Sequence, residues 1–149
     1  MRVLLDINVI LDAMLQRAPW QQDADAVIQA AKLGLIVCST TAHSLPTIFY
    51  VGKKALGRAA ARTEVRTYLT AFEIISIGKQ TLLDADALSG PDFEDDIVIA
   101  AAVASAQDAI VTRNTSDFAH SPILVLTPPE LLKRIQMLIP PPATANVPP

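Results

Sequence analysis

Short apolar runs alternate with helical patterns along the whole chain. The runs are rich in branched side chains and apolar on both faces, as is typical of strands buried on both sides. The predicted strands are residues 2–5, 35–38, 73–77, 109–112 and 123–126. Between them, apolar positions at helical spacing predict helices at residues 9–17, 22–33, 43–54, 58–72, 79–88, 94–107 and 129–138. This alternation predicts an α/β fold, a three-layer α/β/α sandwich with a central, mainly parallel sheet of about five strands.

A single domain is expected to span residues 1–139, because no repeat or linker interrupts the pattern. The last ten residues, "PPPATANVPP" (140–149), hold five of the eleven prolines and no charge. Such a segment cannot extend a helix or a sheet. It predicts a disordered tail after the domain.

Composition and charge narrow the class of protein. A net charge of −3 and a pI near 5.2 argue against an extended basic surface for nucleic acid, although a local one stays open. Cys38 has no partner for a disulfide or a thiolate zinc site, which favours a reducing cytoplasm. Asp6 and Asp12 interrupt the first apolar run too early for a secretory signal. The five glycines form no phosphate-binding loop, so a dinucleotide or P-loop function loses support.

Several polar residues fall where predicted strands end. Asp6 follows the first strand directly, with Asn8 two residues later. The fourth strand ends in a second polar group: Thr112, Arg113 and Asn114, then Asp117. The stretch "DFEDD" (92–96) opens the helix that leads into that strand. Because ligands of open parallel sheets collect beyond the carboxyl ends of the strands, these acids are expected to meet there.

Each acid also has an ordinary structural interpretation. Asp6 and Asp117 suit a helix cap or a turn, and Asp92 suits the N-cap of the helix that follows it. Glu94 and Asp96 suit the dipole of that helix. Together the acids are harder to explain, because two carboxylates about 4 Å apart repel by ~4 kcal/mol at an effective dielectric of about 20. A compensating Mg²⁺ or Mn²⁺ is therefore expected.

Two motifs carry a resemblance to a known family. "LLDINVILD" at the first strand and "DFEDDIVIAAAVASAQDAIVTRNTSDF" (92–118) resemble the PIN domain, in particular the small bacterial proteins that include VapC-type toxins. The resemblance covers roughly residues 1–132. It implies a metal-dependent ribonuclease that uses a quartet of acids and is the toxin of a toxin-antitoxin pair. Three of them match Asp6, Asp95 and Asp117, and the spacing to "TRN" favours Asp95 over Asp96.

The second acid of the quartet is where this sequence departs from the family. The matching position is Thr47, which can hydrogen-bond but carries no charge. His43, Asp92, Glu94 or Asp96 could compensate. Asn8, Thr112 and Asn114 are expected to support the site. The alternative is a catalytically weakened PIN-like module that binds RNA or a protein partner without cleaving.

Two surfaces are candidates for contacts with substrate or partner. Arg58, Arg62 and Arg66 recur at every fourth position and so share one helix face, close after Lys53 and Lys54. They form either an RNA-phosphate track or a solvated helix face. Arg113 beside the acids is the better phosphate ligand.

Trp20 precedes a helical apolar pattern, and core packing is the default interpretation of that pattern. The resemblance implies that the early helices accept an antitoxin segment or form a homodimer. An exposed Trp20 would therefore favour an interface.

Overall fold

Five parallel strands form the central sheet of the computed structural model, which describes residues 1–138. They are β1 (Arg2–Leu5), β2 (Val37–Thr41), β3 (Glu73–Ile75), β4 (Ala109–Val111) and β5 (Leu124–Leu126), in the order β3-β2-β1-β4-β5. Val3 of β1 lies opposite Cys38 of β2 and Ala109 of β4. The parallel sheet of five strands is confirmed. The predicted tail, residues 140–149, lies outside the described residues.

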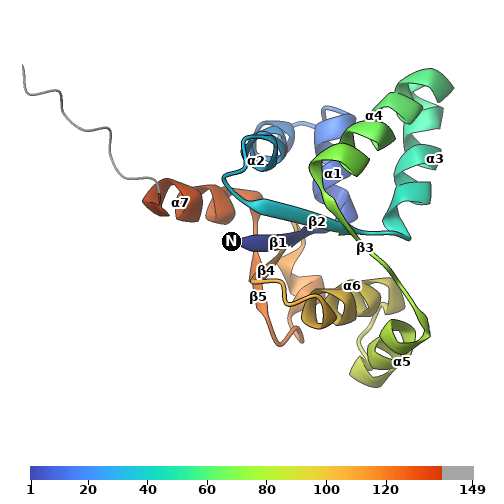
Figure 1. Ribbon diagram of the computed structural model, residues 1–149, viewed down its shortest axis with the longest axis vertical. Coiled ribbons are helices and arrows are strands. Elements are labelled where there is room, and N and C mark those ends of the chain that lie inside the picture. The colour runs from blue at the N-terminus through green and yellow to red at the C-terminus, as the bar shows by residue number, and fades with distance from the viewer. Residues whose placement is uncertain (139–149) are drawn as a thin grey trace, which may run out of the picture.

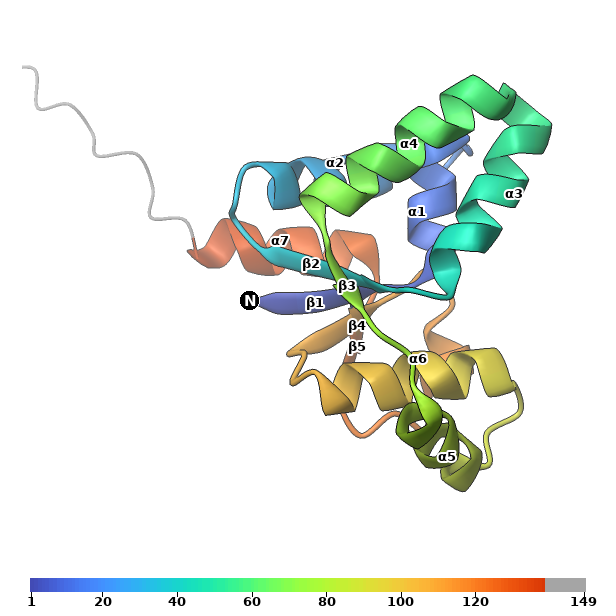
Figure 2. The same ribbon diagram turned by 45° about the vertical axis from the view of Figure 1, so that its right-hand side comes forward.

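Helices cover both faces of the sheet (Figure 1). They are α1 (Ile7–Met14), α2 (Gln21–Lys32), α3 (Ser44–Leu56), α4 (Arg58–Ala71), α5 (Lys79–Leu88), α6 (Phe93–Ala104) and α7 (Pro128–Leu138), with a 3-10 turn, η1 (Thr115–Phe118). α5 and α6 lie on one side of the sheet and the other helices on the opposite side. In Figure 2, α3 and α4 form a hairpin that projects from the sheet. No helix among residues 1–138 is both long and apolar enough to cross a bilayer.

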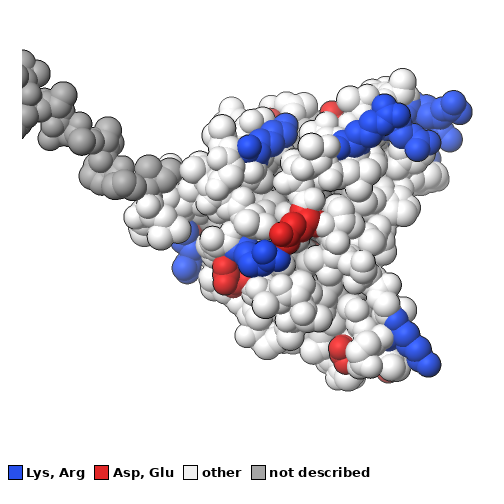
Figure 3. Space-filling model, in the orientation of Figure 1, with Lys and Arg blue, Asp and Glu red and all other residues white. Residues whose placement is uncertain are grey.

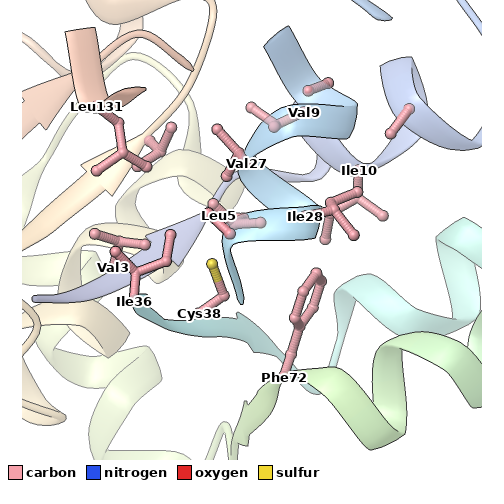
Figure 4. Close-up of a cluster of buried hydrophobic side chains, with 14 of the residues drawn as sticks. Val3, Leu5, Val9, Ile10, Val27, Ile28, Ile36, Cys38, Phe72 and Leu131 are labelled. Atoms are coloured by element: carbon pink, nitrogen blue, oxygen red, sulfur yellow. The ribbon is translucent and has the colours of Figure 1, made fainter. Parts of the chain in front are cut away.

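The strands bury alternate side chains against two helical layers. Val3 and Leu5 of β1 join the larger cluster, which includes Val27 of α2 and Leu131 of α7 (Figure 4). Leu4, between them in sequence, points to the other face and packs with Ile99 of α6. Because both faces are covered by apolar side chains, the continuous apolar runs in the sequence are explained.

β2 lies further along the chain than the pattern predicts. The expected strand was 35–38, but the structure has Val37–Thr41, and Ser39, Thr40 and Thr41 are buried. Ser39 donates a hydrogen bond to the Gln107 side chain at 3.3 Å. Hydroxyls satisfied in this way can be buried, and an apolar pattern does not reveal them. The extra residues carry the strand to the edge of the sheet where α3 begins.

Candidate metal-binding site

A cavity of about 170 Å³ lies beyond the carboxyl ends of β1 and β4. It brings together the three predicted metal ligands, which come from the end of β1, the start of α6 and η1. The polar residues that line it are Asp6, Asn8, Ser44, Asp92, Glu94, Asp95, Asn114 and Asp117. Side chains up to 111 positions apart in sequence therefore share one cavity, as the positions of the predicted strand ends imply.

Asp6 is fixed by neutral hydrogen-bond donors. Its backbone N–H donates to the carbonyl of Val111 at 2.9 Å, which extends the pairing of β1 with β4 by one residue. Its Oδ2 accepts hydrogen bonds from Thr112 Oγ1 at 2.8 Å and Asn8 Nδ2 at 2.7 Å. Burial raises the pKa of Asp6, the Thr112 hydrogen bond lowers it, and the charges of Glu94 and Asp117 raise it. In the part of the chain that the structure describes, the carboxyl group is thus held by neutral donors with no cationic side chain bonded to it.

The "TRN" turn after β4 orders this arrangement. Thr112 is fully buried, and its Oγ1 also accepts from Asn8 Nδ2 at 3.1 Å and from the Asn114 backbone N–H at 3.1 Å. Asn8 Oδ1 accepts from the Arg113 backbone N–H at 3.4 Å. Thr112 and Asn8 therefore contact the Asp6 carboxyl group directly, while Asn114 lines the cavity and closes the turn.

Asp95 lies on the first turn of α6, where Asp92 is the N-cap. Asp92 Oδ1 accepts from the backbone N–H groups of Glu94 at 2.8 Å and Asp95 at 3.3 Å, so the predicted cap is confirmed. Burial raises the pKa of Asp95 to about 6, assisted by the charges of Asp6, Asp92, Asp117 and Glu94. Burial is thus the main cause of this upward shift, and the neighbouring carboxylates add to it.

Asp96 faces away from these acids and is almost completely buried. Its Oδ2 accepts from the Gly90 backbone N–H at 2.9 Å, and its Oδ1 lies 2.6 Å from His120 Nε2. Asp96 therefore has a tertiary role that its expected effect on the helix dipole does not describe. It is not among the residues that line the cavity, so it does not replace the second acid there.

The position of the second family acid is outside the cavity lining. Thr47 is exposed on α3, and Ser44 is the α3 residue that lines the cavity. His43, at the start of α3, places Nε2 3.9 Å from Glu94 Oε1. Both ring nitrogens are buried without a hydrogen-bond partner among residues 1–138. Burial lowers the pKa of His43 and the Glu94 charge raises it. Glu94 is thus the extra acid that both lines the cavity and contacts the α3 side.

Arg113 points to a different carboxylate. Its Nη1 lies 2.9 Å and 3.1 Å from the two carboxylate oxygens of buried Asp12, and its guanidinium stacks 4.2 Å above the Trp20 ring. Arg17 approaches Asp12 at 3.7 Å. The sequence did not reveal this pairing across 101 positions, although an Asp within the apolar run "VILDAML" is a signal for a buried partner. The predicted Arg113 phosphate contact would require this pairing to open.

Trp20 is 45% exposed and borders a second cavity, of about 240 Å³, which also contacts Asp23, Pro128 and Pro129. The helical pattern that follows Trp20 does pack in the core, as its default interpretation predicts, since Ala24, Val27 and Ile28 are buried, whereas Trp20 itself lies outside the core. An exposed tryptophan beside an open cavity favours the interface interpretation instead.

The α3–α4 hairpin concentrates positive charge. Residues 44–71 hold five of the 12 Lys and Arg residues and one of the 15 acids, so they carry +4 while the chain carries −3. Lys54 lies 4.5 Å above the Tyr50 ring and Arg62 5.0 Å above the Phe49 ring. Figure 3 shows blue side chains gathered at this end of the molecule. In the described part of the chain, no ion pair joins these cations to a carboxylate.

The donor set of the acid cavity fits Mg²⁺ or Mn²⁺ in chemistry. Both ions prefer carboxylate, amide and hydroxyl oxygens, and the cavity offers all three. Burial and the charges of the surrounding acids both raise the pKa of Asp95. Within residues 1–138, however, no three His, Cys, Asp or Glu side chains are arranged as a ready-made metal cage.

Comparisons with known proteins agree on fold and family. A PIN-domain family model matches residues 2–116. No curated protein matches the chain. A toxin-antitoxin complex from Klebsiella pneumoniae shares 24% identity with a TM-score of 0.65, covering 85% of this chain and 97% of that one. The structure of DNA-bound VapBC from Salmonella typhimurium shares 15% identity with a TM-score of 0.65, and the match covers 86% of this chain and 98% of that one. VapC20 of Mycobacterium tuberculosis, a sarcin-ricin loop cleaving toxin, shares 12% identity with a TM-score of 0.59. That match covers 72% of this chain and 86% of the other.

Proposed function

The chain belongs to the PIN-domain family, and on that premise we propose that it is a Mg²⁺- or Mn²⁺-dependent endoribonuclease, the toxin of a VapBC-type pair. The observation that carries this proposal is the cavity lined by Asp6, Asp95 and Asp117, in which no Lys or Arg of the described residues takes part. The fold resemblance to toxin-antitoxin structures supports the assignment to a toxin.

In this proposal Asp6, Asp95 and Asp117 hold the cation. When bound, a divalent ion offsets charge that develops on a phosphate and makes water a stronger nucleophile. Thr112 and Asn8 keep the Asp6 carboxyl group oriented, since both donate to its Oδ2. The Asp92 cap fixes the first turn of α6, which carries Asp95. Asn114 lines the same cavity and is available to substrate.

Glu94 is proposed to supply the fourth carboxylate in place of the exposed Thr47. It lines the cavity, and its charge raises the pKa of both Asp6 and Asp95. His43 is the neighbour that can orient it, since a small movement of the Glu94 side chain would convert their 3.9 Å approach into a hydrogen bond.

The direct test is cleavage of RNA by purified variants. We expect Asp6→Asn and Asp95→Asn each to reduce metal-dependent cleavage by on the order of 100-fold, because each removes charge that holds the cation. Glu94→Gln is expected to have a smaller effect. Asp86→Asn, on the exposed face of α5, is the control and should cleave normally.

Unchanged cleavage by Asp6→Asn and Asp95→Asn would refute the mechanism. The alternative, a catalytically weakened module, predicts a different pattern. It would show no calorimetric binding of Mn²⁺ at millimolar concentration while RNA binding stays intact.

We further propose that the α3–α4 hairpin contacts the RNA backbone. Among residues 1–138, no carboxylate forms an ion pair with the cations of this hairpin, which are Lys53, Lys54, Arg58, Arg62 and Arg66. Tyr50 is 58% exposed, so its ring is available for base stacking. For single-stranded RNA, each lost phosphate contact should reduce the slope of log affinity against log salt by about 0.7. Arg58→Ala and Arg66→Ala should therefore flatten this slope in metal-free binding assays, whereas Lys133→Ala on α7 should not. Equal slopes would contradict the proposal.

A protein partner is proposed at the Trp20 cavity. Stacking with Arg113 leaves Trp20 ordered but 45% exposed, and exposed aromatic anchors are typical of interfaces. We assign this surface to the antitoxin rather than to a homodimer, the other expected assembly. Trp20→Ala should weaken antitoxin binding without changing the molar mass of the isolated protein. A change in that mass alone would favour the homodimer.

A further inference from the structure

Three segments next to the acid cavity meet at the buried Asp96 carboxyl group. Gly90 belongs to the connection between α5 and α6, Asp96 to α6, and His120 to the segment after η1. Asp96 Oδ2 accepts the Gly90 N–H at 2.9 Å, and Asp96 Oδ1 lies 2.6 Å from His120 Nε2. We refer to these three residues as the clamp.

The clamp is tightly packed. The Asp96 side chain is 3% exposed and the His120 side chain 29% exposed. A Cβ atom on residue 90 would overlap both Asp96 Oδ1 and His120 Nε2. Only glycine therefore lets the connection approach the hydrogen-bonded pair. Nearby, Phe118 anchors η1 in the core with Leu4 and Ile99.

The positions of the clamp residues relate them to the proposed metal ligands. Asp95 and Asp96 are consecutive on α6, so their side chains leave the helix about 100° apart, one lining the cavity and the other facing His120. Asp117 lies three residues before His120 and also lines the cavity. The Asp96–His120 contact therefore joins the two segments that carry Asp95 and Asp117.

Those two segments have a reason to separate. Asp95 and Asp117 carry like charges when ionised and line the same cavity. Repulsion favours arrangements in which η1 moves away from α6. The short hydrogen bond between Asp96 and His120 opposes that movement, and it does so without contacting the side chains of Asp95 and Asp117.

We propose that Asp96 and His120 are positioning residues that keep Asp95 and Asp117 beside each other for the divalent cation. The inference rests on the proposed function, because it assigns these two residues a part in metal binding. Neither residue touches the cation. They act through the backbone segments that they join, in the way that outer hydrogen bonds orient metal ligands in general.

The test compares metal affinity with stability in the same variants. Calorimetric titration with MnCl₂ should give an affinity about tenfold weaker for His120→Ala than for the unmodified protein, in line with the usual effect of outer-shell partners. His120→Gln should recover most of this loss, since its amide can donate to Asp96. Asp96→Asn, which preserves shape, is the second variant and should be weakened as well.

Arg2→Ala is the matched control. Arg2 pairs with Glu73 at 2.6 Å and joins β1 to β3 at the opposite end of the strands from the cavity. Its loss removes a tertiary side-chain link, so thermal stability can fall, but the affinity for Mn²⁺ should not change.

Two results would overturn the inference and leave the nuclease proposal intact. The first is a normal Mn²⁺ affinity in folded His120→Ala and Asp96→Asn, with lower melting temperatures only. The second is a weakened affinity that His120→Gln does not restore. If the unmodified protein bound no Mn²⁺, the proposed function and this inference would both be wrong.

Discussion

Asp6 and Asp12 lie six positions apart in the same N-terminal segment, and both are buried. Asp12 has the guanidinium of Arg113 at 2.9 Å and that of Arg17 at 3.7 Å. Within residues 1–138, the side-chain donors to Asp6 are the hydroxyl of Thr112 and the amide of Asn8. Thr112 and Arg113 are consecutive, so one turn supplies a neutral partner to one acid and a cation to the other.

This difference separates an acid that is paired within the fold from one that we propose as a metal ligand. A buried carboxylate that only stabilises structure is expected to be paired, as Asp12 is. The acid cavity instead gathers further carboxylates around Asp6, and among residues 1–138 no cationic side chain lines it, which agrees with the cation that we propose there. Asp96, the third buried acid, belongs with Asp12 because a backbone N–H and His120 satisfy it.

The largest loss of stability is expected when Arg113 is removed from the compensated region, by which we mean Asp12 with Arg113 and Arg17. In Arg113→Ala, Asp12 keeps only the longer contact with Arg17, so we expect a loss of about 3 kcal/mol in the free energy of unfolding, at the lower end for a broken buried pair. Urea denaturation measures it. Arg134→Ala, exposed on α7, should change stability by less than about 0.5 kcal/mol. Equal effects of the two substitutions would mean that Asp12 needs no partner.

Gly90→Ala should disturb the hydrogen bonds of Asp96 and lower stability by less than Arg113→Ala does. The added Cβ overlaps Asp96 and His120, so the free energy of unfolding should fall by about 2 kcal/mol, as for overpacked sites elsewhere. Gly78→Ala is the control, because nothing lies within 4 Å of its added Cβ and its φ is negative. Thermal unfolding of both variants tests this, and a tolerated Gly90→Ala would show that the clamp can relax.

In the acid cavity, removing a charge should stabilise the metal-free protein, whereas removing the charge of Arg113 should destabilise it. The pKa of Asp95 is about 6 in the folded protein against an ordinary 3.8, so folding is favoured when this group is protonated. That contribution is complete below about pH 3.8 and is lost as pH rises through about 6. After allowance for the partial exposure of Asp95, the metal-free protein should lose about 1 kcal/mol relative to Asp95→Asn between pH 4.5 and 7.5. Urea denaturation of both proteins in EDTA at each pH would measure this loss. The same pH dependence of the free energy of unfolding in both proteins would contradict it.

The sequence anticipated the acid cavity better than the compensated region. Asp6 and Asp117 could be placed because strand ends in a parallel sheet meet at one edge, which depends on topology alone. The Asp12–Arg113 pair depends on the rotamers of two side chains 101 positions apart. The Asp96–His120 contact likewise joins positions that no local pattern relates. The end of β2 was missed because Ser39, Thr40 and Thr41 are buried but polar.

We propose that a divalent cation supplies the positive charge that the acid cavity lacks among the described residues. Titration of the Asp95 carboxyl carbon by NMR, in EDTA and then with excess Mg²⁺, tests it most directly. We predict a pKa of about 6 without metal and a clear decrease when Mg²⁺ is added, because a cation favours the charged form. An Asp95 pKa near the ordinary 3.8 without metal, or one that Mg²⁺ leaves unchanged, would contradict the account.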